Sequence, residues 1–319
     1  MHPITTPTRL IVTLLLSCMI WLPTLAQSTT QVSDTPPVAR VYILSGQSNM
    51  VGSGQAKELA AAWQQPIDGA FIYKQGKYAT VEAGTAGRFG PEIGLAHYLR
   101  NNQPGRPNIY LIKFALSGQP LDAGWTKPSA NGGGWVGPEP GPNRTTFYPG
   151  TSTNDPNIGL HYKRLYAHVT KAMQQLKDDG YRPELQGIIW MQGEADAKHE
   201  VSAGRYDKSL ALLKQRLEDD FAGGNNVPFV FGQVLPYEPA LDRFTHRDLI
   251  RERMAQADGR SGDDRAIANV WMVPTEGMEL LKDTVHYSTK GLLAMGQAFG
   301  LEMLKAHRFA EESDPASKQ

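Results

Sequence analysis

The chain has 319 residues, and its 32 lysines and arginines balance 32 aspartates and glutamates, so the formal net charge is zero. This length can bury a sizeable core, and the balanced charge offers no electrostatic basis for binding nucleic acid or an anionic membrane surface. The one cysteine, Cys18, lies in an apolar N-terminal run, which excludes a disulfide framework, a thiolate nucleophile and a Cys-based metal site from the rest of the chain.

Residues 1–26 have the features of a secretory signal peptide. Arg9 is followed by an apolar run that ends in small residues at Ala26. An uncleaved anchor and a lipoprotein site at Cys18 are the alternatives, but the apolar run continues past Cys18 and no later segment is long and apolar enough to span a bilayer. Residues 27–39 are polar and typical of a linker. The sequence predicts a secreted or periplasmic protein with no stable membrane insertion after cleavage.

The remaining chain alternates apolar runs with helical patterns. The runs that predict strands are 40–45, 69–74, 108–115, 185–192, 227–235 and 266–273. The patterns that predict helices are 91–102, 158–180, 202–221, 243–258 and 288–307. Most strand runs are continuously apolar, which is typical of strands covered on both faces. This order predicts one three-layer α/β/α domain with a mainly parallel sheet, from residue 40 to 308, followed by a polar tail at 309–319.

Residues 119–157 interrupt the alternation with a long segment rich in glycine and proline. Long connections without secondary structure are uncommon in compact domains and are often functional. This one follows a strand, so it is expected beside the carboxyl ends of the strands, where parallel sheets place their sites. Trp125 and Trp135 are candidates for a wall that stacks on a sugar. The alternative is a solvated insertion whose aromatic side chains pack on its own base.

Ser48 is the candidate nucleophile. It follows the first predicted strand in "GQSNM", at the carboxyl end of that strand. A serine attacks only when a base removes its proton and a third group orients that base. Taken alone, the stretch favours a serine that merely caps a turn, as most serines after strands do.

Asp283 and His286 are the candidates for the acid and the base. They lie three residues apart, just before the last predicted helix. In such a loop the carboxylate can accept a hydrogen bond from one imidazole nitrogen while the other nitrogen faces the serine. The alternative is an incidental pair in an exposed loop.

Three groups are candidates for the donors that stabilise an oxyanion. They are the backbone amide of Ser48, the backbone amide of Gly118 after another strand, and the side-chain amide of Gln192. For Gln192 the alternative is a buried amide that is satisfied locally. Glu194 and Asp196 could also form a carboxylate pair for glycoside or metal chemistry, but their two-residue separation and the lack of a second acidic cluster disfavour it. No metal or other cofactor is predicted.

Three blocks of the sequence resemble the signatures of one esterase group. They are "GQSNM" at 46–50, "WMQGEADA" at 190–197 and "DTVH" at 283–286. Together they resemble the sialate O-acetylesterase and acetyl xylan esterase branch of the SGNH (GDSL-like) hydrolases, over nearly all of the chain after the linker. The resemblance implies a flavodoxin-like fold and a metal-free serine esterase that removes O-acetyl groups from carbohydrate.

The resemblance also implies a role for each matched residue. Ser48 would be the nucleophile, His286 the base and Asp283 its orienting partner. Gly118 would supply an oxyanion amide, with Gly90 as the alternative donor, and Gln192 would take the place of the asparagine of the wider superfamily. The supporting residues expected behind these groups are Gln47, Asn49 and Glu194.

Several questions stay open at the level of sequence. A same-fold esterase or thioesterase for other acyl groups, a non-catalytic carbohydrate-binding protein and a carboxylate-based glycosidase are the competing functions. The expected partner is an acetylated carbohydrate, and the neutral charge balance slightly favours a neutral polysaccharide. The sequence does not specify the sugar or the oligomeric state.

Overall fold

The computed structural model describes residues 1, 35–126, 134–137, 141, 144–239 and 241–313. Apart from Met1, the predicted signal peptide lies outside these residues, as do most of the predicted linker and the end of the predicted tail. From Pro36 onward the chain forms one compact unit. Within the described part of the chain, no helix combines the length and apolar character needed to cross a bilayer.

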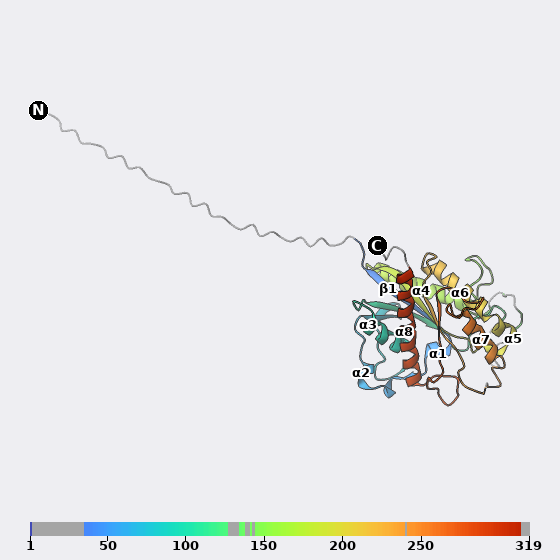
Figure 1. The fold of residues 1–319 in the computed structure, drawn as a ribbon. Helices are drawn as coiled ribbons and strands as arrows, with labels where there is room; N and C mark the ends of the chain where they lie inside the picture. The colour runs from blue at the N-terminus through green and yellow to red at the C-terminus, as the bar shows by residue number, and fades with distance from the viewer. Residues whose placement is uncertain (2–34, 127–133, 138–140, 142–143, 240, 314–319) are drawn as a thin grey trace. The chain divides into compact units, whose positions relative to one another are not determined.

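A seven-stranded sheet forms the centre of this unit (Figure 1). Its strands are β1 (Val38–Gly46), β3 (Ala70–Lys74), β4 (Lys77–Thr80), β6 (Ile109–Ala115), β7 (Arg182–Met191), β8 (Phe229–Gly232) and β9 (Val270–Val273). The order is β4-β3-β6-β1-β7-β8-β9, and every neighbouring pair is parallel except β3 and β4. Two short strands, β2 (Gly54–Gln55) and β5 (Arg88–Phe89), form a separate antiparallel pair. All six predicted strands are confirmed, whereas β4 was not predicted because this short edge strand is largely exposed and lacks an apolar run.

The helices occupy the connections between the strands. They are α1 (Ser48–Val51), α2 (Ala61–Gln64), α3 (Glu92–Asn102), α4 (Leu160–Asp178), α5 (Glu200–Gly204), α6 (Tyr206–Phe221), α7 (Arg247–Ala257) and α8 (Thr289–Ser313), with short 3-10 turns η1 (Ala56–Glu58) and η2 (Asp196–Lys198). The five predicted helices are present, although the pattern at 202–221 is divided between α5 and α6. Because α8 runs to Ser313, residues 309–313 of the predicted tail are helical.

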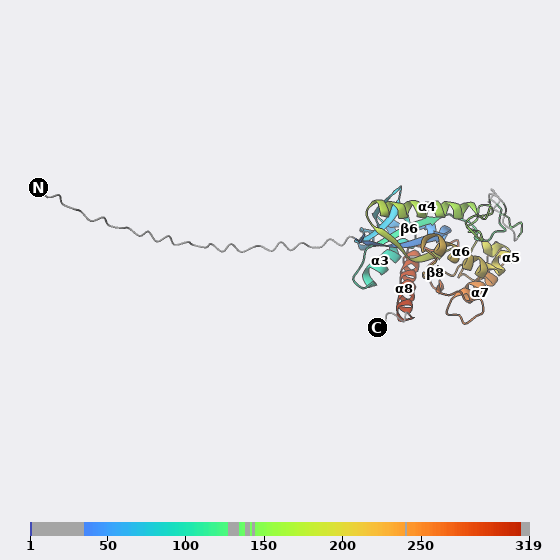
Figure 2. The ribbon, with the colours of Figure 1, turned by 90° about the horizontal axis from the view of Figure 1, so that it is seen from above.

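The helices cover the sheet in two layers (Figure 2). Helices α3 and α8 pack against each other on one face, and α4 covers β1, β6 and β7 on the other. The hydroxyl of Tyr162 in α4 donates to Asp220 Oδ2 in α6 over 2.7 Å, which joins these two helices. The predicted three-layer, mainly parallel α/β/α domain is confirmed.

The central strand β1 determines where the loops that follow the sheet meet. It pairs with β6 on one side and β7 on the other, and the register aligns Gly46 with both Ala115 and Met191. Its residues 41–44 are fully buried, as expected for a strand covered on both faces. The segments after β1, β6 and β7 therefore begin at one level, at the carboxyl edge of the sheet.

Gly46 allows the chain to turn sharply at this edge. Its φ is +141°, and a Cβ at this position would lie 2.1 Å from the carbonyl oxygen of Met191. The next backbone amide, that of Gln47, donates to the same carbonyl over 2.8 Å. Only a residue without a side chain permits this approach, and it brings the start of α1 against the end of β7.

Candidate active site

Ser48, His286 and Asp283 form a continuous hydrogen-bonded chain. His286 Nε2 lies 3.0 Å from Ser48 Oγ, and His286 Nδ1 lies 2.6 Å from Asp283 Oδ2. Ser48 opens α1 immediately after β1, whereas Asp283 and His286 lie in the loop before α8, so the fold joins residues 238 positions apart. This arrangement has the form of a nucleophile, a base and an orienting acid.

The Asp283 carboxylate is held by the loop as well as by the imidazole. Its Oδ1 accepts from the backbone amides of Val285 at 3.0 Å and His286 at 2.9 Å. Partial burial acts to raise the pKa of Asp283, but the hydrogen bonds from the His286 side chain and from these two amides outweigh it and lower the pKa to about 2. A carboxylate that stays ionised can fix the imidazole tautomer and stabilise its cation.

Two of the candidate oxyanion donors belong to residues that line the cavity. Ser48 and Gly118 both line it, and within the described residues neither amide has a hydrogen-bond partner. Gly118 adopts φ +69°, a backbone conformation that favours glycine. The alternative donor Gly90 is buried, and its amide donates to both carboxylate oxygens of Glu92 at 3.0 and 3.1 Å. The geometry therefore favours Gly118 over Gly90.

Gln192 lies beneath the site rather than on its wall. It is fully buried and is not among the residues that line the cavity. Its Nε2 donates to Asp196 Oδ2 at 2.7 Å and to the Gln119 carbonyl at 3.2 Å, and it lies 3.4 Å from Gln47 Oε1. Its Oε1 accepts from the Tyr206 hydroxyl at 3.2 Å. This is the locally satisfied amide of the alternative interpretation, and the structure does not bring Gln192 to an oxyanion position.

The other residues expected to support the site do contact it. Gln47 Oε1 accepts from the amide of Ala195 at 3.3 Å, which joins the start of α1 to the loop after β7. The Nδ2 of Asn49 donates to Glu194 Oε1 at 2.7 Å. Glu194 lines the cavity but is 2 % exposed, and its Oε2 has no partner among the described residues. Burial raises the pKa of the Glu194 carboxyl, and the hydrogen bond from Asn49 acts in the opposite direction.

The two tryptophans expected to form a sugar-stacking wall instead anchor the insertion. Trp125 is 5 % exposed, and the two tryptophans form an isolated antiparallel bridge. The ring of Trp135 stacks on His199 with centroids 4.2 Å apart and an interplanar angle of 17°. Neither tryptophan lines the cavity next to Ser48. The two tryptophans thus contact each other and the segment after β7 rather than the cavity, so the predicted sugar-stacking wall is not found at this position.

The cavity beside Ser48 has a volume of about 450 Å³. Its lining residues are Gln47, Ser48, Ser117, Gly118, Glu194, Ala195, Lys198, Arg243, Phe244, Val285 and His286. Sequence reasoning missed Lys198, Arg243 and Phe244. No motif marks them, because they come from two connections that only the tertiary fold brings opposite Ser48.

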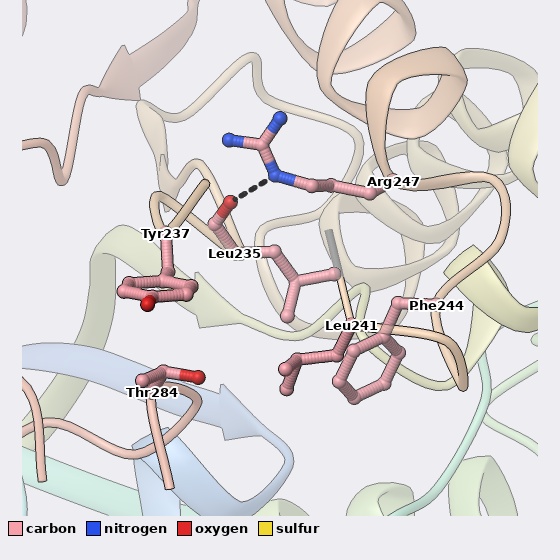
Figure 3. Close-up of a pocket in the computed structure, with 6 residues that line it drawn as sticks. All are labelled: Leu235, Tyr237, Leu241, Phe244, Arg247 and Thr284. Carbon is pink, nitrogen blue, oxygen red and sulfur yellow. Dashed lines mark hydrogen bonds between the residues drawn. The ribbon is translucent and has the colours of Figure 1, made fainter. Parts of the chain in front are cut away.

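Phe244 also closes a second, smaller cavity of about 10 Å³ next to the first (Figure 3). Arg247 also lines this cavity, and its Nε donates to the carbonyl of Leu235 over 2.8 Å, the contact drawn in Figure 3. Thr284, which follows Asp283, lines the same cavity. A space of this size holds at most about one water molecule, and Phe244 lines both this space and the main cavity.

No group of three or more histidine, cysteine, aspartate or glutamate side chains suited to a metal ion occurs in the part of the chain that the structure describes.

Comparison with known proteins places the chain in a family. The mainly parallel sheet, with Ser48 at the carboxyl edge of β1, agrees with the fold that the sequence resemblance implies. The model of the family "carbohydrate esterase, sialic acid-specific acetylesterase" matches residues 38–305, and the chain belongs to this family. It is therefore a carboxylic ester hydrolase of the carbohydrate acetylesterase class. No curated protein sequence matches the chain.

Solved structures with low sequence identity share the fold. A protein from Arabidopsis thaliana is 18% identical with a TM-score of 0.58, over 85% of this chain and 98% of that one. NanS is 15% identical with a TM-score of 0.57, over 86% of this chain and 99% of its own. A carbohydrate acetylesterase from Xanthomonas citri is 16% identical with a TM-score of 0.50, over 84% of this chain and 56% of that one.

Proposed function

We propose that this chain hydrolyses O-acetyl esters of carbohydrate through an acyl-enzyme, with Ser48 as nucleophile, His286 as general base and Asp283 as its orienting partner. The observation that carries the proposal is the unbroken chain of contacts, 2.6 Å from Asp283 to His286 and 3.0 Å from His286 to Ser48, at the wall of the 450 Å³ cavity.

In the first step His286 Nε2 accepts the hydroxyl proton as Ser48 Oγ attacks the acetyl carbonyl carbon. The oxyanion that forms accepts hydrogen bonds from the amides of Ser48 and Gly118. The bond to the sugar oxygen then breaks, and His286 returns the proton to the departing hydroxyl. A water molecule, deprotonated by the same imidazole, attacks the acetyl-serine and releases acetate.

The test is the loss of activity in Ser48→Ala and His286→Ala. Each variant should lower turnover of 4-nitrophenyl acetate by roughly 10³-fold or more, because removing one member of such a triad removes the function of the whole. The melting temperature is the control for folding. More than a few per cent residual activity in folded Ser48→Ala contradicts the assignment. A preference for acyl chains longer than acetyl favours the alternative of a same-fold esterase or thioesterase.

The charge of the cavity favours a sugar that carries a carboxylate. Lys198 and Arg243 line the cavity and are exposed, and within the described residues neither forms an ion pair. Burial raises the pKa of the Glu194 carboxyl on the same wall. The two exposed cations can pair with the carboxylate of a uronic or other acidic sugar, which a neutral polysaccharide lacks, although the whole chain is neutral.

Replacement of these two cations tests the sugar class. Lys198→Gln and Arg243→Gln should each raise KM for an acetylated acidic sugar by roughly fivefold, the factor of about 1 kcal/mol for an exposed ion pair. KM for acetylated xylan should not change, and Lys208→Gln, an exposed lysine outside the cavity, is the matched control. Acetate release is measured on acetylated xylan, acetylated pectin and O-acetyl sialic acid. Equal effects on neutral and acidic substrates contradict this choice.

Export to the periplasm or the medium completes the proposal. Its support is the signal-peptide pattern of residues 1–26 and the start of the compact unit at Pro36, only a short distance after the expected cleavage site. N-terminal sequencing of the exported protein should begin at Gln27, and an intact N-terminus contradicts cleavage.

A further inference from the structure

Asn49, the residue after the nucleophile, contacts the loop that carries the base. Its side chain is 1 % exposed. Its Nδ2 donates to the carbonyl of Val285 at 3.1 Å, and its Oδ1 accepts from the amide of Tyr287 at 3.2 Å. Val285 and Tyr287 are the two neighbours of His286, so one buried amide group holds the peptide units on both sides of the base.

The orientation of the Asn49 amide is determined by its partners. The carbonyl of Val285 can only accept, whereas the amide of Tyr287 can only donate. Only one of the two amide orientations satisfies both, and that orientation also lets Nδ2 donate to Glu194 Oε1. Glu194 is buried, follows β7 and accepts a hydrogen bond from the same Nδ2, so it helps to hold the Asn49 side chain in this orientation.

We propose that Asn49 is a positioning residue that sets the distance between His286 Nε2 and Ser48 Oγ. Ser48 and Asn49 share the first turn of α1, so the helix that carries the nucleophile also hydrogen-bonds to the backbone on both sides of the base. Glu194 acts through Asn49 by fixing its orientation. This inference rests on the proposed function, because it assigns the purpose of Asn49 to the reaction between Ser48 and His286.

The Ser48–His286 contact depends on the position of the loop that Asn49 holds. At 3.0 Å it is a hydrogen bond, and a shift of the loop by 1 Å would abolish it. The contact between His286 and Asp283 is different, because both residues lie in the same short loop and move together. Loss of Asn49 should therefore separate the base from the nucleophile while the base keeps its orienting acid.

The loop has other tethers that keep it folded without Asn49. The amide of Leu281 donates to the carbonyl of His286 at 2.7 Å. The hydroxyl of Ser53 donates to the carbonyl of Tyr287 at 2.7 Å. Neither contact involves Asn49 or Glu194, so a variant of Asn49 should displace the loop rather than unfold it.

The experiment compares Asn49→Ala with Ser45→Ala. Ser45 is a buried residue of β1 whose hydroxyl donates to the carbonyl of Phe114 at 2.7 Å, a similar buried contact that does not involve the loop. Asn49→Ala should lower kcat by roughly 10²-fold with KM changed less than about threefold, because a misplacement near 1 Å has this effect on a reacting pair. Ser45→Ala should keep kcat within about twofold.

A spectroscopic readout separates displacement from unfolding of the loop. The proton between His286 Nδ1 and Asp283 should give a downfield proton NMR signal, which His286→Ala would assign by its disappearance. In Asn49→Ala this signal should persist while kcat falls. Loss of the signal together with kcat shows that the loop has unfolded and overturns a positioning role. Unchanged kcat in Asn49→Ala, with Ser48→Ala inactive, overturns the inference and leaves the proposed function intact.

A paired substitution keeps the test decisive if Asn49→Ala does not fold. Asn49→Asp retains the acceptor for Tyr287 but places a second carboxyl against Glu194. In the double variant Asn49→Asp with Glu194→Gln, the glutamine at 194 can donate to the aspartate at 49. This is the reverse of the wild-type hydrogen bond, in which Asn49 donates to Glu194. Because the donor to the Val285 carbonyl stays absent, the pair should raise kcat above that of Asn49→Asp alone without reaching the wild-type value. No increase contradicts the role given to Glu194 in orienting residue 49.

Discussion

Asp283 is an exposed side chain that orients the base of the candidate site. Its side chain is 44% exposed, yet its two carboxylate oxygens accept from the His286 imidazole and from two backbone amides. Among the residues that the structure describes, Asp283 is the only partner of His286 Nδ1. The orientation and tautomer of the base therefore depend on this carboxylate.

Asp283→Asn should lower kcat by roughly 10² to 10⁴-fold, because an amide favours the wrong imidazole tautomer and cannot stabilise the cation. Kinetics on 4-nitrophenyl acetate at neutral pH measure this effect. A loss below about fivefold contradicts the orienting role and indicates that another group holds the imidazole.

The same substitution should alter how the stability of the fold depends on pH in acid solution. The folded pKa of Asp283 lies below its ordinary value of 3.8, at about 2, so its contribution to folding is present above pH 3.8 and is lost as the pH falls toward 2. The melting temperature of Asp283→Asn should depend less steeply on pH in this window than that of the wild type. An equal dependence shows that the depressed pKa has no consequence for folding.

At the scale of elements, Asp196 and Asp122 attach the insertion to the sheet. Asp196 follows β7 and accepts from the amides of Leu121 at 2.9 Å and Asp122 at 3.1 Å. Burial, and the nearby charge of Asp122, raise the pKa of Asp196 to about 7. Asp122 in turn pairs with Arg205, at the junction of α5 and α6, and accepts from Trp135 Nε1 at 3.2 Å. These contacts hold the segment that begins with the cavity residue Gly118.

Asp122→Ala should lower the free energy of unfolding by about 2–3 kcal/mol, because it removes one partner of a largely buried ion pair. It should also lower kcat/KM several-fold, since Gly118 loses its support. Urea denaturation and kinetics measure the two effects. Asp155→Ala is the control, because the Asp155 contacts to Thr151 and Asn157 are local to the insertion and lie at the surface. Equal effects of the two variants contradict an anchoring role for Asp122.

At the scale of the whole molecule, the site depends on the order of the strands. The chain enters the centre of the sheet with β1 and places β6 and β7 on its two sides. The loops with Ser48, Gly118 and Glu194 thus meet although they are far apart in sequence. The fold also decides where charge is placed. The chain has zero net charge, yet Lys198 and Arg243 both line the cavity. The net charge governs long-range attraction to polyanions, whereas these two side chains act on the bound sugar.

The limits of sequence reasoning appear at particular residues. Gln192 occupies a strand end, as an oxyanion donor would, but its amide is directed at Asp196 and the Gln119 carbonyl. Trp125 and Trp135 lie in the expected segment, but Trp125 is buried and Trp135 stacks on His199, and neither lines the cavity. Position along a strand can be inferred from periodicity, whereas the direction of a side chain depends on partners that come from distant parts of the chain.

The sequence by itself determined the layered α/β/α fold, because continuous apolar runs and helical periodicity are local properties. It also indicated Ser48, Asp283 and His286, since the acid and the base lie in one short loop and the serine follows a strand end. Only the tertiary structure decided that Ser48 and Gly118 line the cavity, that Lys198 and Arg243 border it, and that Asn49 hydrogen-bonds to the loop of the base. The reason is that each of these features depends on contacts across more than 40 residues, and such contacts exist only once the sheet has brought the loops together.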